Sequence, residues 1–284
     1  MQRFYRILLG CCIVAACGGV VVVTSKNRED SLPRFPSFFM TSGFVEDAYT
    51  AVGVGDAGAG VRMVLVNHHL LASRLIAQAL LPGIASRPSV VVLISPDHFS
   101  RGAAPISSVI AVWPTPFGDI RPARSEIERF ASERVVNLEE QPFFHEHGIT
   151  NITMFIARAF PDARLLPIIV KSTASDRSVE ALAEQLTALT RSVLIVGSFD
   201  FTHDSTEEQA LRNDALSLEI LSRGDLERSR DITVDSNAGI RLMMSVARLQ
   251  NLSFRLLERS SSAVVLRDTK RTDVTSYITG VWSK

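Results

Sequence analysis

The stretch VVVLISPDH, from Val90 to His98, carries the pattern on which the fold depends. Its first five residues are aliphatic and mostly β-branched, which is typical of a strand buried on both faces of a parallel sheet. Pro96, Asp97 and His98 follow almost at once, so the strand ends where polar, reactive side chains begin. Asp97 has two readings, a turn residue after Pro96 or a member of a binding pocket.

Two more apolar runs of strand length end in the same way. Val61–Val66 leads into Asn67-His68-His69, and Val193–Val196 leads into Asp200-Phe201-Thr202-His203. The remaining two of the six histidines lie on either side of Glu146. Ligands of open α/β sheets bind at the carboxyl ends of the strands, so we expect these clusters to converge in one pocket. A lone histidine after a strand is more often a hydrogen-bonded loop residue, but clusters that share one topological position favour a metal site or an acid–base site.

The rest of the chain alternates between helical and strand patterns, which predicts an α/β fold with a parallel sheet. We expect helices at Leu70–Leu81, Arg124–Glu133, Ile149–Ala159, Ser178–Thr190, Thr206–Ser222 and Ser236–Gln250. We expect further strands at Ile106–Val112, Arg164–Val170, Leu252–Leu257 and Thr275–Val281. Leu32–Ser42 has the composition of a linker or an entry strand, and Gly53–Gly60 that of a flexible segment.

Charge and cysteine content exclude several functions. The chain has 30 basic and 30 acidic residues, so it lacks the positive excess typical of nucleic-acid binding. Cys11, Cys12 and Cys17 are its three cysteines, which leaves the rest of the chain without disulfides, zinc-finger spacing or a thiol nucleophile. Any metal there must be held by nitrogen and oxygen. The absence of a Gly-x-Ser-x-Gly motif disfavours a serine hydrolase.

An uncharged N-terminal stretch, Ile7–Thr24, follows Arg3 and Arg6 and predicts a membrane anchor. Val14–Cys17 also resembles a lipoprotein cleavage box, and a cleaved signal peptide is the third reading. Lysine and arginine are balanced on the two sides of the stretch, but its export-like character leads us to expect the soluble domain outside the cytoplasm. We therefore divide the chain into a membrane anchor or signal segment, residues 1–30, and an α/β domain, residues 31–284.

Short motifs along the chain resemble those of one known family. They are Asn67-His68, Pro96-Asp97-His98, Thr115-Pro116-Phe117, Glu146-His147-Gly148, Phe199-Asp200-Phe201-Thr202-His203 and Ser276-Tyr277-Ile278-Thr279-Gly280. Their order and spacing are similar to those of the Memo family, also called AmmeMemoRadiSam system protein B, over roughly residues 45–284. This family is related in fold to the class III extradiol dioxygenases. Together with the strand-end clusters, the resemblance implies a three-layer α/β/α sandwich with a mostly parallel central sheet.

The chain departs from the family pattern at a candidate metal ligand. Where the family has Cys-Gly-Arg-x-Pro-Ile, this sequence has Asp235-Ser236-Asn237-Ala238-Gly239-Ile240. Asn67 replaces a proline, leucines replace the glycine and aromatic residue after the histidine, and the N-terminal family motif is degenerate around Ser42–Tyr49. Asp235 is either the N-cap of the following helix or a ligand that completes a set with His68 and His98. Two histidines and one carboxylate suit non-haem Fe(II), and His69 is the alternative to His68.

The chemistry of such a metal site also suggests roles for other polar residues. His147 and His203 would either contact the metal ligands or act as acid–base groups, because a metal-activated phenol or dioxygen intermediate needs a nearby proton carrier, and Asp200 would orient a histidine. His145 is expected to be exposed. The favoured function is a non-haem iron-dependent oxidoreductase that acts on a small, aromatic or catechol-like molecule. A non-catalytic binding or scaffold protein of the same family is the alternative, and a metal-dependent hydrolase is a second one.

Overall fold

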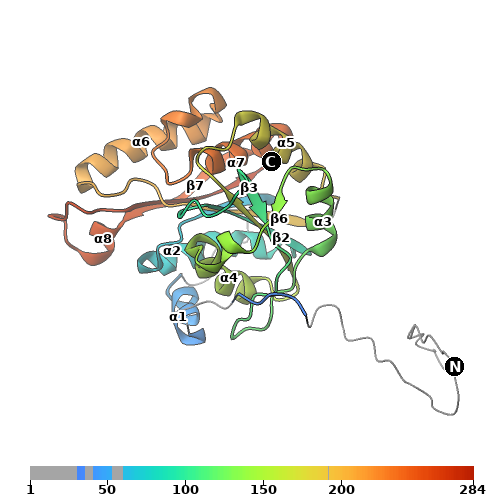
Figure 1. Cartoon of the computed structure of the whole chain (residues 1–284). Coiled ribbons are helices and arrows are strands. Elements are labelled where there is room, and N and C mark those ends of the chain that lie inside the picture. The colour runs from blue at the N-terminus through green and yellow to red at the C-terminus, as the bar shows by residue number, and fades with distance from the viewer. Residues whose placement is uncertain (1–30, 36–40, 53–59, 191) are drawn as a thin grey trace, which may run out of the picture. The chain divides into compact units, whose positions relative to one another are not determined.

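An eight-stranded sheet lies at the centre of the computed structural model, which describes residues 31–35, 41–52, 60–190 and 192–284 (Figure 1). The strand order within these residues is β4-β3-β5-β2-β6-β1-β8-β7. The strands are β1 (Val61–Val66), β2 (Val90–Pro96), β3 (Ile106–Ser108), β4 (Asn137–Leu138), β5 (Arg164–Val170), β6 (Val193–Ser198), β7 (Ser253–Ser261) and β8 (Ser276–Ser283). Strands β5, β2, β6 and β1 are mutually parallel, while β3 and β8 pair antiparallel with the two outer members of this group.

Helices cover both faces of the sheet, which confirms the expected three-layer α/β/α arrangement (Figure 1). Helices α1, α2 and α4 pack on one face, and α3, α5, α6 and α7 pack on the other. The helices are α1 (Ser42–Val52), α2 (Ser73–Ile84), α3 (Arg124–Ser132), α4 (His147–Ala159), α5 (Asp176–Thr187), α6 (Glu207–Arg223), α7 (Asn237–Gln250) and α8 (Ser262–Leu266), with 3-10 turns at Leu70–Ala72, Gln141–Phe144 and Leu226–Asp231.

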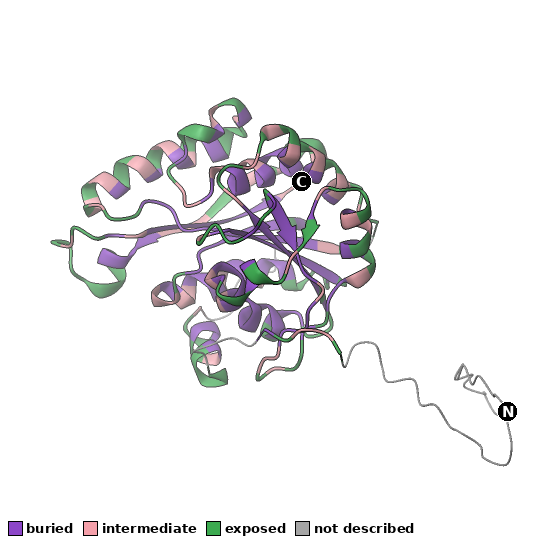
Figure 2. Cartoon of the chain, in the orientation of Figure 1, coloured by how far each residue is buried: buried purple, intermediate pink, exposed green. Residues whose placement is uncertain are grey.

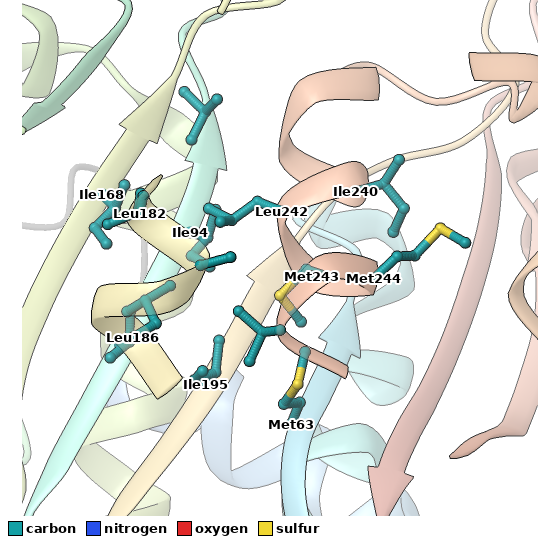
Figure 3. Close-up of a cluster of buried hydrophobic side chains, with 14 of the residues drawn as sticks. Met63, Ile94, Ile168, Leu182, Leu186, Ile195, Ile240, Leu242, Met243 and Met244 are labelled. Carbon is teal, nitrogen blue, oxygen red and sulfur yellow. The ribbon is translucent and has the colours of Figure 1, made fainter. Parts of the chain in front are cut away.

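The parallel strands are buried on both faces, as the continuous apolar runs predict (Figure 2). In β2, Val92 and Ile94 face one core, whereas Val91 and Leu93 face the other, because successive strand side chains point to opposite faces. Figure 3 shows the first of these cores, in which strand residues such as Ile94 lie against aliphatic side chains of α5 and α7.

The structure corrects several predicted boundaries. The strands at Val61–Val66 and Arg164–Val170 are confirmed to the residue. The strand predicted at Ile106–Val112 is wrong in length, because β3 leaves the sheet after Ser108. Further along that run, Val112 forms only an isolated bridge to Arg34. Helix α1 was not predicted, since its buried positions Val45, Ala48 and Tyr49 make a short apolar face with no sequence signal at its start.

The predicted membrane anchor at Ile7–Thr24 lies outside the described residues, as does most of the segment Gly53–Gly60. Within the described ranges, no helix has the length and apolar character needed to cross a membrane. Residues 34–284 form one compact unit by themselves.

Candidate metal centre

Three histidine rings meet above the carboxyl ends of the parallel strands. His68 follows β1 and His98 follows β2, and these strands lie on either side of β6. Neighbouring strands are about 4.8 Å apart, yet the rings of His68 and His98 come within 4.9 Å of each other, centroid to centroid. The ring of His147, at the start of α4, lies 5.0 Å from that of His68 and 4.1 Å from that of His98. One ligand atom from each histidine lies within 4.8 Å of the others, so this group can hold a metal ion.

Glu146 fixes the position of His98. It is fully buried and forms the N-cap of α4, where its carboxylate accepts a bond from the N–H of Gly148. The same carboxylate accepts bonds from the backbone N–H of His98 at 3.0 Å and from its Nδ1 at 2.6 Å. A helix N-terminus stabilises a buried carboxylate. The Nε2 atom of His98 is thereby turned towards the centre, as in the carboxylate–histidine pairs that orient metal ligands.

Ser198, the last residue of β6, determines the tautomer of His68. Its hydroxyl donates its only hydrogen to the carbonyl of Gly148 at 2.7 Å. It can therefore only accept from Nδ1 of His68, which lies 3.2 Å away. The proton of neutral His68 then sits on Nδ1, and Nε2 presents a lone pair. Burial is the main reason that the pKa of His68 falls to about 3, so this ring is neutral at pH 7.

Two carboxylates face that lone pair. Nε2 of His68 lies 3.4 Å from Oδ2 of Asp235 and 3.5 Å from Oδ2 of Asp200. The Oδ2 atom of Asp235 also lies 3.6 Å from Nε2 of His98. Reciprocal bonds hold the two aspartates in place, because the N–H of Asp200 donates to Oδ2 of Asp235 and the N–H of Asp235 donates to the carbonyl of Asp200. Asp200 also accepts from the N–H of His68.

The donor set fits a metal ion held by nitrogen and oxygen. Bonds of about 2.1 Å that meet at roughly 90° to 110° separate neighbouring ligand atoms by about 3.0 to 3.4 Å. The distances from Asp235 to the two histidines are close to these values. Oδ1 of Asp235 is buried and has no hydrogen-bond partner among the described residues. A cation between these atoms, a proton or a metal ion, relieves the repulsion of the facing lone pairs.

The charges around the centre differ sharply. For His98, burial lowers the pKa, but the bonds to Asp235 and Glu146 outweigh it and raise the pKa to about 10. The pKa of His147 is lowered, first by burial and then by the positive charge of His98. Burial raises the pKa of Asp200, against backbone N–H bonds that favour its charged form.

The reading of Asp235 as an N-cap is wrong. Helix α7 begins one residue later than predicted, and its N-cap is Ser236, whose hydroxyl accepts from the N–H of Gly239. The side chain of Asp235 is 7% exposed and turns to the histidines instead. His69, the alternative to His68, is exposed and its Nδ1 pairs with the hydroxyl of Tyr277 at 2.7 Å.

The other predicted polar residues lie further out. His203 is exposed, and its charge lowers the pKa of Asp200. His145 is exposed, as expected. Asp97 is a turn residue, because its carboxylate accepts from the N–H groups of Arg101 and Gly102 in its own loop.

Sequence reasoning missed the roles of Glu146 and Ser198. Glu146 stands directly before a predicted helix and between two histidines, a position that signals an N-cap or an orienting carboxylate. Ser198 gives no comparable signal, because a small polar residue at a strand end has many uses.

The fold and this centre define the class: an α/β/α protein with a histidine–carboxylate site at the ends of its parallel strands. Residues 51–281 match the family described as Memo-like protein, and the chain belongs to this family. A MEMO1 family protein of Thermotoga neapolitana is 27% identical over 209 residues, covering 69% of this chain and 73% of the relative. One of Thermotoga petrophila is 29% identical over 211 residues, covering 68% and 72%.

A solved structure shares the fold. The crystal structure of the uncharacterized protein JW3007 from Escherichia coli K12 matches with a TM-score of 0.51 at 12% identity. The match covers 77% of this chain and 99% of that protein. At this level of identity the likeness supports the architecture alone.

Proposed function

We propose that this protein binds a divalent metal ion, Fe(II), through His68, His98 and Asp235, and that the centre oxidises a small aromatic or catechol-like molecule. One observation carries the proposal. Nε2 of each histidine lies within 3.6 Å of a single oxygen of Asp235, whose second oxygen is buried and has no hydrogen-bond partner in the described part of the chain. Two histidines and a carboxylate are the ligand set typical of non-haem Fe(II) oxygenases, and a donor set without sulfur argues against copper(I).

Each surrounding residue has a defined task in this proposal. Bound Fe(II) would supply Lewis acidity and one-electron redox chemistry at open coordination positions. Ser198 and Glu146 each hold an Nδ1–H, on His68 and His98 respectively, so that Nε2 of His68 is free to coordinate and Nε2 of His98 becomes free when a metal ion displaces its second proton.

His147 is suited to move a proton. Its side chain is 42% exposed, so a ligand can reach it, and its lowered pKa keeps the ring neutral at pH 7. A neutral imidazole beside the centre can accept the proton of a phenol. His203 is a second proton carrier at the rim, and Asp200 orients His68 through the backbone bond.

Metal content of the full-length protein tests the ligand assignment. After anaerobic loading with Fe(II), we expect about one iron per chain in the wild type and almost none in Asp235→Asn, which keeps the shape of the side chain but removes its charge. Asp162→Asn is the matched control, because Asp162 is exposed in the loop before β5, at the opposite end of the sheet. Equal iron content in Asp235→Asn and the control would contradict the ligand set.

Oxygen uptake separates the three function classes. Iron-dependent oxygen consumption with catechol supports the oxidoreductase. Full metal content without turnover of any phenol would indicate the binding or scaffold protein. Anaerobic, metal-dependent cleavage of 4-nitrophenyl acetate or 4-nitrophenyl phosphate would indicate the hydrolase, in which a metal-activated water is the nucleophile.

A further inference from the structure

The loop between β2 and β3 is built to hold a fixed shape beside the centre. Asp97 is buried, and its two oxygens accept from the N–H groups of Arg101 and Gly102, each at 3.0 Å. The N–H of Ser100 donates to the carbonyl of Asp97. Ser100 has a φ of +50°, a left-handed conformation that costs a non-glycine residue about 1 kcal/mol. The bonds to Asp97 therefore enforce a conformation that the chain would not adopt freely.

This loop presents an aromatic ring and a cation at the surface. Phe99 is 50% exposed, although a phenyl ring gains free energy from burial. Its ring lies 6.1 Å from that of His147, edge to face, and the guanidinium carbon of Arg101 lies 5.3 Å from the Phe99 centroid. Arg101 is exposed, and no carboxylate pairs with it in the part of the chain that the structure describes.

We propose that Phe99 and Arg101 form a recognition platform for a planar ligand that carries a carboxylate. The ring of the ligand would pack on Phe99, next to His147, and its carboxylate would take the two parallel N–H groups of Arg101. The substrate class is therefore a hydroxylated aromatic acid rather than a neutral phenol. This inference rests on the proposed function, because it assumes that the hydroxyl end of the ligand reaches the metal.

Charge explains where the carboxylate of the ligand would lie. Asp200, Asp235 and Glu146 place three carboxylates around the histidines, and these repel an anion from the centre. Arg101 supplies a charge of opposite sign at the rim, where it is not already neutralised. A carboxylate held at Arg101 stays outside the acidic interior while the neutral end of the ring points inward.

Calorimetric titration of the full-length, Fe(II)-loaded protein with two probes tests the platform. The probes are 3,4-dihydroxybenzoate and catechol, which differ by the carboxylate. We expect 3,4-dihydroxybenzoate to bind about tenfold more tightly to the wild type, as for one charge-assisted contact. Arg101→Gln should reduce this ratio to about one, and Phe99→Leu should weaken both probes by a similar factor of about five. Both positions are exposed, so the variants should fold.

Arg177→Gln is the matched control, because Arg177 is exposed on α5 and also has no carboxylate partner among the described residues. The platform is refuted if Arg101→Gln keeps the tenfold ratio, or if Arg177→Gln abolishes it as well.

The platform and the proposed function fail in different ways. Benzoate lacks hydroxyl groups, so its binding to metal-free protein reports on the platform alone. If Arg101→Gln weakens benzoate binding but the iron-loaded wild type consumes no oxygen with catechol, the platform stands and the proposed chemistry does not. If the iron-loaded wild type consumes oxygen with catechol but Arg101→Gln changes the binding of neither probe, the proposed chemistry stands and the platform is wrong.

Discussion

The same three strands, β1, β2 and β6, contribute to two interiors of opposite character. In the core of Figure 3, Met63, Ile94 and Ile195 pack against the helices and every labelled side chain is apolar. A few residues further on, the strands deliver His68 and His98 to a centre that contains three carboxylates. The core stabilises the fold by burial, whereas the centre keeps a buried carboxylate oxygen that has no hydrogen-bond partner among the residues the structure describes. Polar groups gather where these strands end, because loop amides and a helix N-terminus are available there to bind them.

Truncation in the apolar core should have the largest effect on stability and little effect on the metal. Leu242, in α7, is fully buried and belongs to the same core cluster as the strand residues of Figure 3. Leu242→Ala should lower the free energy of unfolding by about 2 to 5 kcal/mol, because it removes buried methyl groups and leaves a cavity. Denaturant unfolding measures this loss. A more than tenfold fall in Fe(II) affinity under native conditions would contradict the expectation that the apolar core and the metal centre are energetically independent.

Alkaline pH should destabilise the metal-free protein through His98. Its pKa is about 10 in the folded state, against about 6.5 in an unfolded chain. The folded protein therefore holds a proton that the unfolded chain has lost, and this stabilisation is complete below pH 6.5 and gone above pH 10. The thermal midpoint should fall as the pH rises across this window. The loss of unfolding free energy should be smaller than that caused by Leu242→Ala, since water partly screens the site. His98→Gln should flatten the profile between pH 6.5 and 10, and an unchanged slope would contradict the pairing with Glu146 and Asp235.

The orienting carboxylate should matter to the metal more than to the fold. Glu146→Gln keeps the size and capping ability of the side chain but loses the charge that holds Nδ1–H of His98. We expect Fe(II) affinity to fall about 10- to 100-fold. Glu140→Gln is the control, because Glu140 is exposed nearby in the chain. Competition with a chelator measures both variants, and equal affinities would show that Glu146 is only a helix cap.

The smallest expected effect is that of Ser236→Ala, and it should distinguish the helix cap Ser236 from the adjacent proposed metal ligand Asp235. Ser236→Ala removes the N-cap of α7 and should cost about 1 kcal/mol of stability. Its metal content should equal that of the wild type, in contrast to Asp235→Asn. If Ser236→Ala lost iron and Asp235→Asn did not, the assignment of cap and ligand would have to be exchanged.

Local signals explain which parts of the fold were predictable. The apolar runs predicted β1 and β5 to the residue, because both strands are buried on both faces except at Arg62 and Arg164. The strand predicted beyond Ser108 was wrong, since the apolar sequence that continues there pairs only through isolated bridges such as Arg34 with Val112 among the described residues. Helix α7 was predicted one residue too long, and that shift moved the cap from Ser236 to Asp235.

Most of the helices and strands, and the chemistry of the donors, follow from the amino-acid sequence alone. The strands end at histidines and aspartates, and all three cysteines lie in the first 17 residues, so the domain can offer only nitrogen and oxygen ligands. The membrane anchor at Ile7–Thr24 and the location outside the cytoplasm stay predictions.

Only the tertiary structure decided which of these groups meet. Strand β6 pairs with both β1 and β2 and lies between them, although more than 90 residues of the chain separate it from each of these strands. This strand order brings His68 and His98 over the same strand end. It also places Ser198 under His68, Glu146 behind His98 and Asp235 between the two rings. Local sequence sets backbone conformation and capping, but the position of a buried lone pair depends on long-range strand pairing. The same hydrogen bonds that complete the fold therefore fix the geometry of the centre.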